Sequence, residues 1–176
     1  MVNYRKSLSL NPSNAAVEAD LGVALFKDGQ GQEGYEHLQK AVDIDPGFAE
    51  GHNDLATALA KMGRLDDAVV EVQKAIALSP SSAGYRYNLG FALELRGNLA
   101  GAVEAFQKSV ELSKGKDARC LSALAEAYDK TGRFPEAIQS ARHAADLAVQ
   151  EQDPQLEQDL KNDIERYQHD GAATHP

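Results

Sequence analysis

The chain contains one cysteine and no tryptophan among its 176 residues. Because a disulfide needs two thiols, Cys120 alone excludes an internal disulfide, and it equally excludes a multi-cysteine metal site. No run of about 18 consecutive apolar residues occurs, so no segment is predicted to insert into a membrane. A single cysteine does not identify the compartment in which the protein works.

Positive charge is also scarce, with 18 basic residues against 27 acidic ones and a net charge of −9. Affinity for nucleic acid comes from clustered lysine and arginine, so an acidic chain of this kind is not predicted to bind nucleic acid. The charge is uneven, because residues 73–145 hold 10 basic and 7 acidic residues. This middle segment is the only net basic part of the chain.

An internal period of 34 residues runs along the chain, and it slips once, to 35. Four residue types keep this register: proline (Pro12, Pro46, Pro80), glycine (Gly29, Gly63, Gly97, Gly132), leucine (Leu21, Leu55, Leu89, Leu124) and lysine (Lys6, Lys40, Lys74, Lys108). Several columns that agree on one period indicate a repeat protein.

Each repeat is predicted to be a pair of helices joined by a short turn. The segment AEGHNDLATALAKMG is free of proline and has apolar residues three and four apart, which is typical of an amphipathic helix. Gly63 is expected to end this helix, because glycine takes a positive φ without strain. The second helix then continues to Pro80, whose ring and missing N–H stop it.

A helix–turn–helix unit of this length, with small residues such as Ala56 and Ala68 where the helices meet, resembles the tetratricopeptide repeat family. The resemblance implies an all-α fold, a right-handed α-solenoid of antiparallel helix–turn–helix repeats with a C-terminal capping helix. It divides the array, residues 1–152, into a half repeat at 1–14 and repeats at about 15–48, 49–82, 83–117 and 118–151. We expect the capping helix at 153–168 and a disordered tail at 169–176.

The chain departs from the family pattern at several positions. Glu18, His52, Arg86 and Leu121 stand where the family commonly has a bulky aromatic residue, and Gly34 replaces an alanine. Since glycine weakens a helix by about 1 kcal/mol relative to alanine, the first repeat is expected to be locally softer. The half repeat lacks its own first helix, which suggests a truncated N-terminal edge and predicts weak self-association through it.

No motif supports catalysis. The segment GQGQEG at 29–34 matches a dinucleotide-binding pattern, but its glycines straddle a predicted helical turn instead of following a strand. The five histidines lack metal-ligand spacing, and Cys120 is expected to be buried and inert. We therefore predict that the protein is not an enzyme and holds neither cofactor nor metal.

The resemblance also implies a concave groove lined by the first helices of the repeats. Tyr87, Phe91 and Leu95 form an apolar stripe on the inward side, and Asp54 and Asn88 continue a polar row that begins at Asp20. The candidate groove residues are Asn53, Asp54, Tyr87, Asn88, Phe91, Leu95, Arg119 and Glu126. Packing of the aromatic residues against neighbouring helices, and simple solvation of the polar row, remain open alternatives.

These features predict a protein–protein interaction scaffold that binds an extended or helical peptide segment in the groove. The basic middle segment favours a partner with acidic and apolar residues. Two alternatives remain: a self-assembly module, and the substrate-recruiting arm of a larger enzyme.

Overall fold

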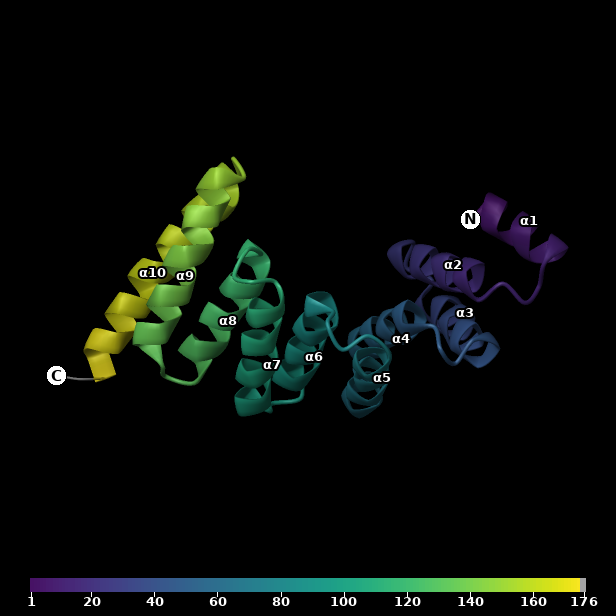
Figure 1. Ribbon diagram of the computed structural model, residues 1–176, viewed down its shortest axis with the longest axis horizontal. Helices are drawn as coiled ribbons and strands as arrows, with labels where there is room; N and C mark the ends of the chain where they lie inside the picture. The colour runs from purple at the N-terminus through teal and green to yellow at the C-terminus, as the bar shows by residue number, and fades with distance from the viewer. Residues whose placement is uncertain (175–176) are drawn as a thin grey trace. The chain divides into compact units, whose positions relative to one another are not determined.

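The computed structural model describes residues 1–174, and every regular element in that range is an α-helix (Figure 1). Its ten helices are α1 (Val2–Leu10), α2 (Ala15–Lys27), α3 (Gly31–Ile44), α4 (Ala49–Lys61), α5 (Leu65–Leu78), α6 (Ala83–Leu95), α7 (Leu99–Leu112), α8 (Ala118–Lys130), α9 (Phe134–Gln150) and α10 (Pro154–Thr174). The predicted all-α fold of helix–turn–helix repeats is confirmed.

Local sequence signals set the helix boundaries. The side chains of Asn14, Ser82 and Asp117 each accept a hydrogen bond from a backbone N–H in the first turn of the helix that follows. The predicted glycine stop is confirmed after α2, α4, α6 and α8, where the glycines have φ between 73° and 85° (Gly29, Gly63, Gly97, Gly132).

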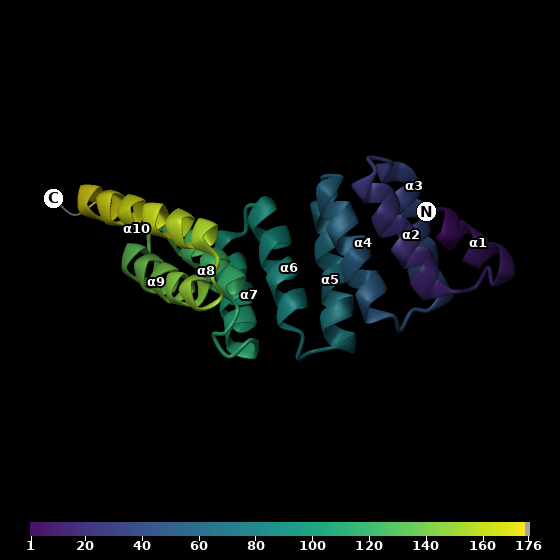
Figure 2. The same ribbon diagram turned by 90° about the horizontal axis from the view of Figure 1, so that it is seen from above.

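The chain divides into two compact units, Met1–Arg96 and Gly97–Pro176. The boundary falls in the turn of the third predicted repeat, so α6 ends unit 1 and α7 begins unit 2. In unit 1, α2 pairs with α3 and α4 with α5 (Figure 2). Helix α4 also contacts α2 on one side and α6 on the other. The candidate functional site lies on these three first helices.

The core of unit 1 is built from the repeated leucines and their partners. Leu21 and Leu25 of α2 are fully buried, as is Val72 of α5, and Leu38 of α3 and Leu55 of α4 are only 1% exposed. The leucine column read from the sequence is therefore the interior column.

The first hairpin is closely packed at its crossing point. A Cβ atom added to Gly34 would lie 2.8 Å from the backbone oxygen of Gly22, and one added to Gly22 would lie 2.8 Å from the oxygen of Gly34. The two backbones touch where the other repeats have at least one alanine. Gly34 is thus required by the packing, a role that the expectation of a softer helix did not include.

Unit 2 packs α7 against α8, α8 against α9 and α9 against α10. Phe106 is fully buried, and Leu160 and Tyr167 of α10 are each 1% exposed. Arg166 of α10 forms an ion pair with Asp129 of α8 at 2.6 Å. Helix α10 therefore covers the apolar side of the last repeat.

The C-terminal helix is longer than the sequence suggested. It begins as predicted, with Asp153 accepting a hydrogen bond from the backbone N–H of Leu156 and Pro154 at the first helical position. It continues to Thr174, so residues 169–174 are helical where a disordered tail was expected. Gly171 extends the contact, because a Cβ added there would lie 3.1 Å from Phe134. Residues 175 and 176 of the predicted tail lie outside the described residues.

Helix α1 has no buried residue. Val2 and Leu10 are each 82% exposed, whereas Tyr4 and Leu8 are partly covered. An ion pair between Arg5 and Glu33, at 2.7 Å, joins the helix to α3. Helix α1 therefore leaves apolar side chains exposed at this edge of unit 1.

Candidate functional site

An amide pair joins the first helices of the second and third repeats. The side-chain nitrogen of Asn88 on α6 donates a hydrogen bond of 2.7 Å to the side-chain oxygen of Asn53 on α4. Both residues are half-buried. A primary amide carries two donors and one two-sided acceptor, so one shared bond leaves capacity for a ligand.

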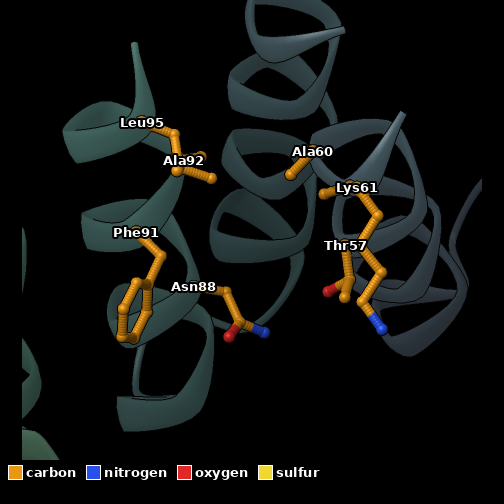
Figure 3. A pocket seen from close by; sticks show the side chains of 8 residues that line it. Thr57, Ala60, Lys61, Asn88, Phe91, Ala92 and Leu95 are labelled. Carbon is orange, nitrogen blue, oxygen red and sulfur yellow. The ribbon is translucent and has the colours of Figure 1, made fainter. Parts of the chain in front are cut away.

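A cavity of about 280 Å³ opens between α4 and α6 beside this amide pair. Its lining is mostly apolar and consists of Ala56, Thr57, Ala60, Lys61, Asn88, Phe91, Ala92 and Leu95. Figure 3 shows Asn88 of α6 and Thr57 of α4 directed toward each other across the gap. Leu95, at the far end of the lining, is 61% exposed.

A second cavity, of about 170 Å³, lies on the other side of α4, against α2. It is lined by Val23, Phe26, Lys27, Leu38, Asp54, Thr57, Ala58 and Lys61. Thr57 and Lys61 belong to both linings, so the two cavities adjoin across α4. We call the combined surface over α2, α4 and α6 the unit 1 groove.

Asp54 is the electrostatically distinctive residue of the unit 1 groove. Partial burial, the nearby carboxylate of Glu50 and that of Asp20 together raise its pKa to about 6. A hydrogen bond from Asn53 and the charge of Lys27 act in the opposite direction, but more weakly. The groove floor at α2 and α4 is therefore rich in negative potential.

Tetratricopeptide repeat family models match residues 53–117 and 120–155, which together span more than half of the chain. The chain belongs to the tetratricopeptide repeat family. Sequence comparison with curated proteins gives no significant match. The family identification rests on the repeats, and neither match points to a catalytic domain.

Solved structures of tetratricopeptide repeat proteins share the fold. A crystal structure of MamA has a TM-score of 0.75 at 27% identity, covering 84% of this chain and 86% of that one. PilF of Pseudomonas aeruginosa has a TM-score of 0.75 at 22% identity, covering 98% and 87%. YrrB, described as having an unusual peptide-binding site, has a TM-score of 0.70 at 14% identity, covering 95% and 93%.

The structure brings five of the predicted groove residues together on unit 1: Asn53, Asp54, Asn88, Phe91 and Leu95. Tyr87 does not line either cavity, and its ring instead contacts Phe91 edge-on, with centroids 4.7 Å apart. The tyrosine therefore packs against Phe91 and does not line either cavity.

Arg119 and Glu126 lie on α8, in unit 2, and each is paired within its own helix region. Arg119 contacts Asp117 at 3.0 Å, and Glu126 contacts Lys130 at 2.7 Å. Both residues belong to unit 2, and their role in a binding groove stays a prediction.

Sequence reasoning missed Ala56 and Ala92 as lining residues of the larger cavity. Ala56 was interpreted only as a helix-packing residue, and Ala92 sits directly beside Phe91. Small side chains on both facing helices leave the space that a ligand side chain can fill. The available signal was the coincidence of small residues on neighbouring first helices next to an aromatic residue.

Among residues 1–174, no group of three or more His, Cys, Asp and Glu side chains is arranged to hold a metal ion. Cys120 is buried, 3.0 Å from the hydroxyl of Ser109, and burial raises the pKa of its thiol. No helix in the same range is long and apolar enough to cross a membrane.

Proposed function

We propose that the protein is a non-catalytic scaffold whose unit 1 groove binds an extended peptide segment. The observation that carries this proposal is the Asn53–Asn88 amide pair beside the apolar cavity between α4 and α6. An amide side chain can donate to a peptide carbonyl and accept from a peptide N–H, while the cavity receives an apolar side chain.

Exposure of the cavity wall supports the same conclusion. Leu95 is 61% exposed at the end of α6, and it stands beside the aromatic side chain of Phe91. Apolar residues gathered around a concavity are typical of interaction sites, and aromatic anchors dominate their binding energy. YrrB, which shares the fold and is described as having a peptide-binding site, is consistent with this use of the repeats.

Ion pairs within the chain weaken the argument for an acidic–apolar partner. Within residues 73–145, which favoured it, four basic residues are paired with acidic residues of this chain: Arg96 with Asp66, Arg119 with Asp117, Lys130 with Glu126, and Arg133 with Glu136. Charges paired in this way attract an acidic segment less strongly. The proposal therefore includes an apolar anchor residue in the partner. Whether acidic residues flank that anchor is a question for the peptide selection.

The test is a selection from phage-displayed dodecapeptides on the full chain, followed by fluorescence anisotropy with the enriched sequences. We expect enrichment of one apolar position and a dissociation constant of roughly 1 μM, as for a short segment on an open groove. Leu95→Glu and Asn88→Ala should weaken binding about tenfold or more. Val70→Glu is the matched control, because Val70 is 50% exposed on α5 outside both cavities. Equal binding by all four proteins would reject the groove.

Self-association is the second candidate, favoured by the exposure of Val2 and Leu10 on α1. A second copy could cover this apolar edge. Light scattering up to millimolar protein should then detect a dimer that Leu10→Lys abolishes. A strict monomer at that concentration, or a dimer insensitive to Leu10→Lys, would contradict this second candidate.

A further inference from the structure

Three carboxylates gather on the part of the unit 1 groove formed by α2 and α4. Asp54 lines the smaller cavity, and the charges of Glu50 and Asp20 act on it. Tyr85 of α6 lies within reach of the same field, since the charges of Glu50 and Asp54 contribute to raising the pKa of its phenol. The negative region therefore involves residues of all three first helices: Asp20 of α2, Glu50 and Asp54 of α4, and Tyr85 of α6.

The negative region is only partly compensated within the protein. Lys27 of α2 is the cation that acts on Asp54, and its effect is smaller than that of either neighbouring carboxylate. Lys61 lines both cavities, and in Figure 3 its side chain extends back alongside Thr57. A further positive charge brought by a ligand would relieve repulsion among the three carboxylates as well as pair with Asp54.

The distance between the two cavities sets where that charge must lie in the ligand. Neighbouring packed helices have axes about 8–10 Å apart, and an extended chain advances about 3.3 Å per residue. A segment that places an apolar side chain between α4 and α6 therefore reaches Asp54 after about three residues.

We infer that the partner segment carries a lysine or arginine about three residues from its apolar anchor, with the anchor in the cavity beside Phe91 and the basic side chain at Asp54. This inference rests on the proposed peptide-binding function and adds the chemistry of the partner. The apolar cavity supplies the anchor site, the amide pair holds the peptide backbone, and Asp54 selects the charge.

The experiment uses the full chain and a phage library of dodecapeptides with a fixed central leucine and randomised flanks. Selection is run on wild type, on Asp54→Asn and on Asp43→Asn. Asp43 is the matched control, because it is an exposed aspartate on α3 that accepts a hydrogen bond from Gln39 and lines neither cavity. The best peptide is then synthesised with lysine, glutamine or glutamate at the selected position.

On wild type and Asp43→Asn, the lysine peptide should bind about tenfold more tightly than the glutamate peptide. On Asp54→Asn the difference should shrink to about threefold or less. Lys27→Met keeps the apolar stem of the side chain but removes its charge, so it should widen the preference for lysine.

A preference for glutamate, or a lysine preference that Asp54→Asn leaves unchanged, would overturn the inference. Leucine-dependent binding that is lost in Leu95→Glu but shows no charge preference would overturn the inference alone and leave the groove standing. A selection that yields no leucine-dependent binder at all would count against both the inference and the proposed function.

Discussion

His52 of α4 and Glu71 of α5 are bonded across the second hairpin, with Nδ1 of the imidazole 2.7 Å from a carboxylate oxygen. Glu18 of α2 and His37 of α3 make the same contact across the first hairpin, at 2.5 Å, with acid and base exchanged. Each pair is separated by 19 residues, so the two pairs occupy equivalent positions of successive repeats. In these two repeats, the position where the family usually has an aromatic residue holds Glu18 or His52, each buried and bonded to a polar side chain of the second helix.

Each of these carboxylates also forms an ion pair with a lysine of the repeated lysine column. Lys40 forms an ion pair with Glu18, and Lys74 forms one with Glu71. Because Lys40 and Lys74 are also 34 residues apart, the lysine reaches its carboxylate whether the acid stands on the first or the second helix of the hairpin. The arrangement tolerates the exchange of acid and base.

The exchange itself is testable in the first repeat. Glu18→His alone and His37→Glu alone should each destabilise the protein by about 2–4 kcal/mol, because each places two similar groups together in a buried site. The double variant recreates the order found in the second repeat, and it should recover at least half of the summed loss. Urea denaturation gives the three values. If the double variant loses the full sum, the pairs do not act as interchangeable units.

The close approach of α2 and α3 gives a prediction opposite to helix propensity. Gly34→Ala should destabilise by about 1–3 kcal/mol, because the new methyl group would lie 2.8 Å from the backbone oxygen of Gly22. Gly84→Ala is the control: its nearest neighbour would be the Ser82 hydroxyl at 3.9 Å, so this change should be neutral or stabilising by up to about 1 kcal/mol. The free energies of unfolding come from urea denaturation. If both variants are more stable than wild type, the hairpin can open to admit the methyl group.

Much of the fold could be predicted from the sequence because the repeat places each residue type in a column. Leu55 and Gly63 could be assigned to the interior and to the turn from the 34-residue period alone, and the structure confirms both. The Glu18–His37 contact was not predicted, although the shared separation of 19 residues was present in the sequence. Its detection requires knowing which faces of the paired helices meet.

The candidate site was less predictable, for reasons of charge and local helix geometry. The basic character of residues 73–145 was visible in the composition, but the pairing of Arg96 with Asp66 depends on how the end of α6 meets the start of α5. The pKa of Asp54 depends on partial burial, and burial cannot be read from the residue types at equivalent positions of the repeats. Residue types indicated the groove, and only the packing showed which of its charges are already compensated.

The register of α4 predicts a sharp contrast between two residues two positions apart. Leu55 is 1% exposed, so Leu55→Ala should destabilise by about 2–5 kcal/mol. Thr57 is exposed on the groove side, and Thr57→Ala should change stability by less than about 0.5 kcal/mol. Similar losses in urea denaturation of the two variants would mean that the helix faces are wrongly assigned.

The capping role of α10 can be measured through Tyr167. Its side chain is 1% exposed, and the guanidinium of Arg166 lies 4.6 Å from its ring centroid. Tyr167→Ala should destabilise unit 2 by about 3–5 kcal/mol, while the exposed neighbour Gln168→Ala should have little effect. Hydrogen exchange of the backbone amides of α8 and α9 measures the loss of stability within unit 2. Unchanged protection in Tyr167→Ala would argue against a stabilising cap.

The raised pKa of Asp54 predicts a pH dependence of stability. Burial, Glu50 and Asp20 raise this pKa to about 6 in the folded protein, above the ordinary value of 3.8, so the folded state binds the proton more tightly than the unfolded state. The ionised carboxylate therefore destabilises the fold, and stability should increase as the pH falls from about 7 to about 4.

Asp54→Asn removes this titration while keeping the shape of the side chain. We expect the variant to be about 1–2 kcal/mol more stable than wild type at pH 8, a value reduced from the full pKa difference because the group is only partly buried. The gain should fall to about 0.3 kcal/mol or less near pH 3.5, where most of the aspartate is protonated in both states. Urea denaturation across this range, with Asp43→Asn as the control, measures the effect. A gain of equal size at both ends of the range would trace the stabilisation to packing or hydrogen bonding instead of charge.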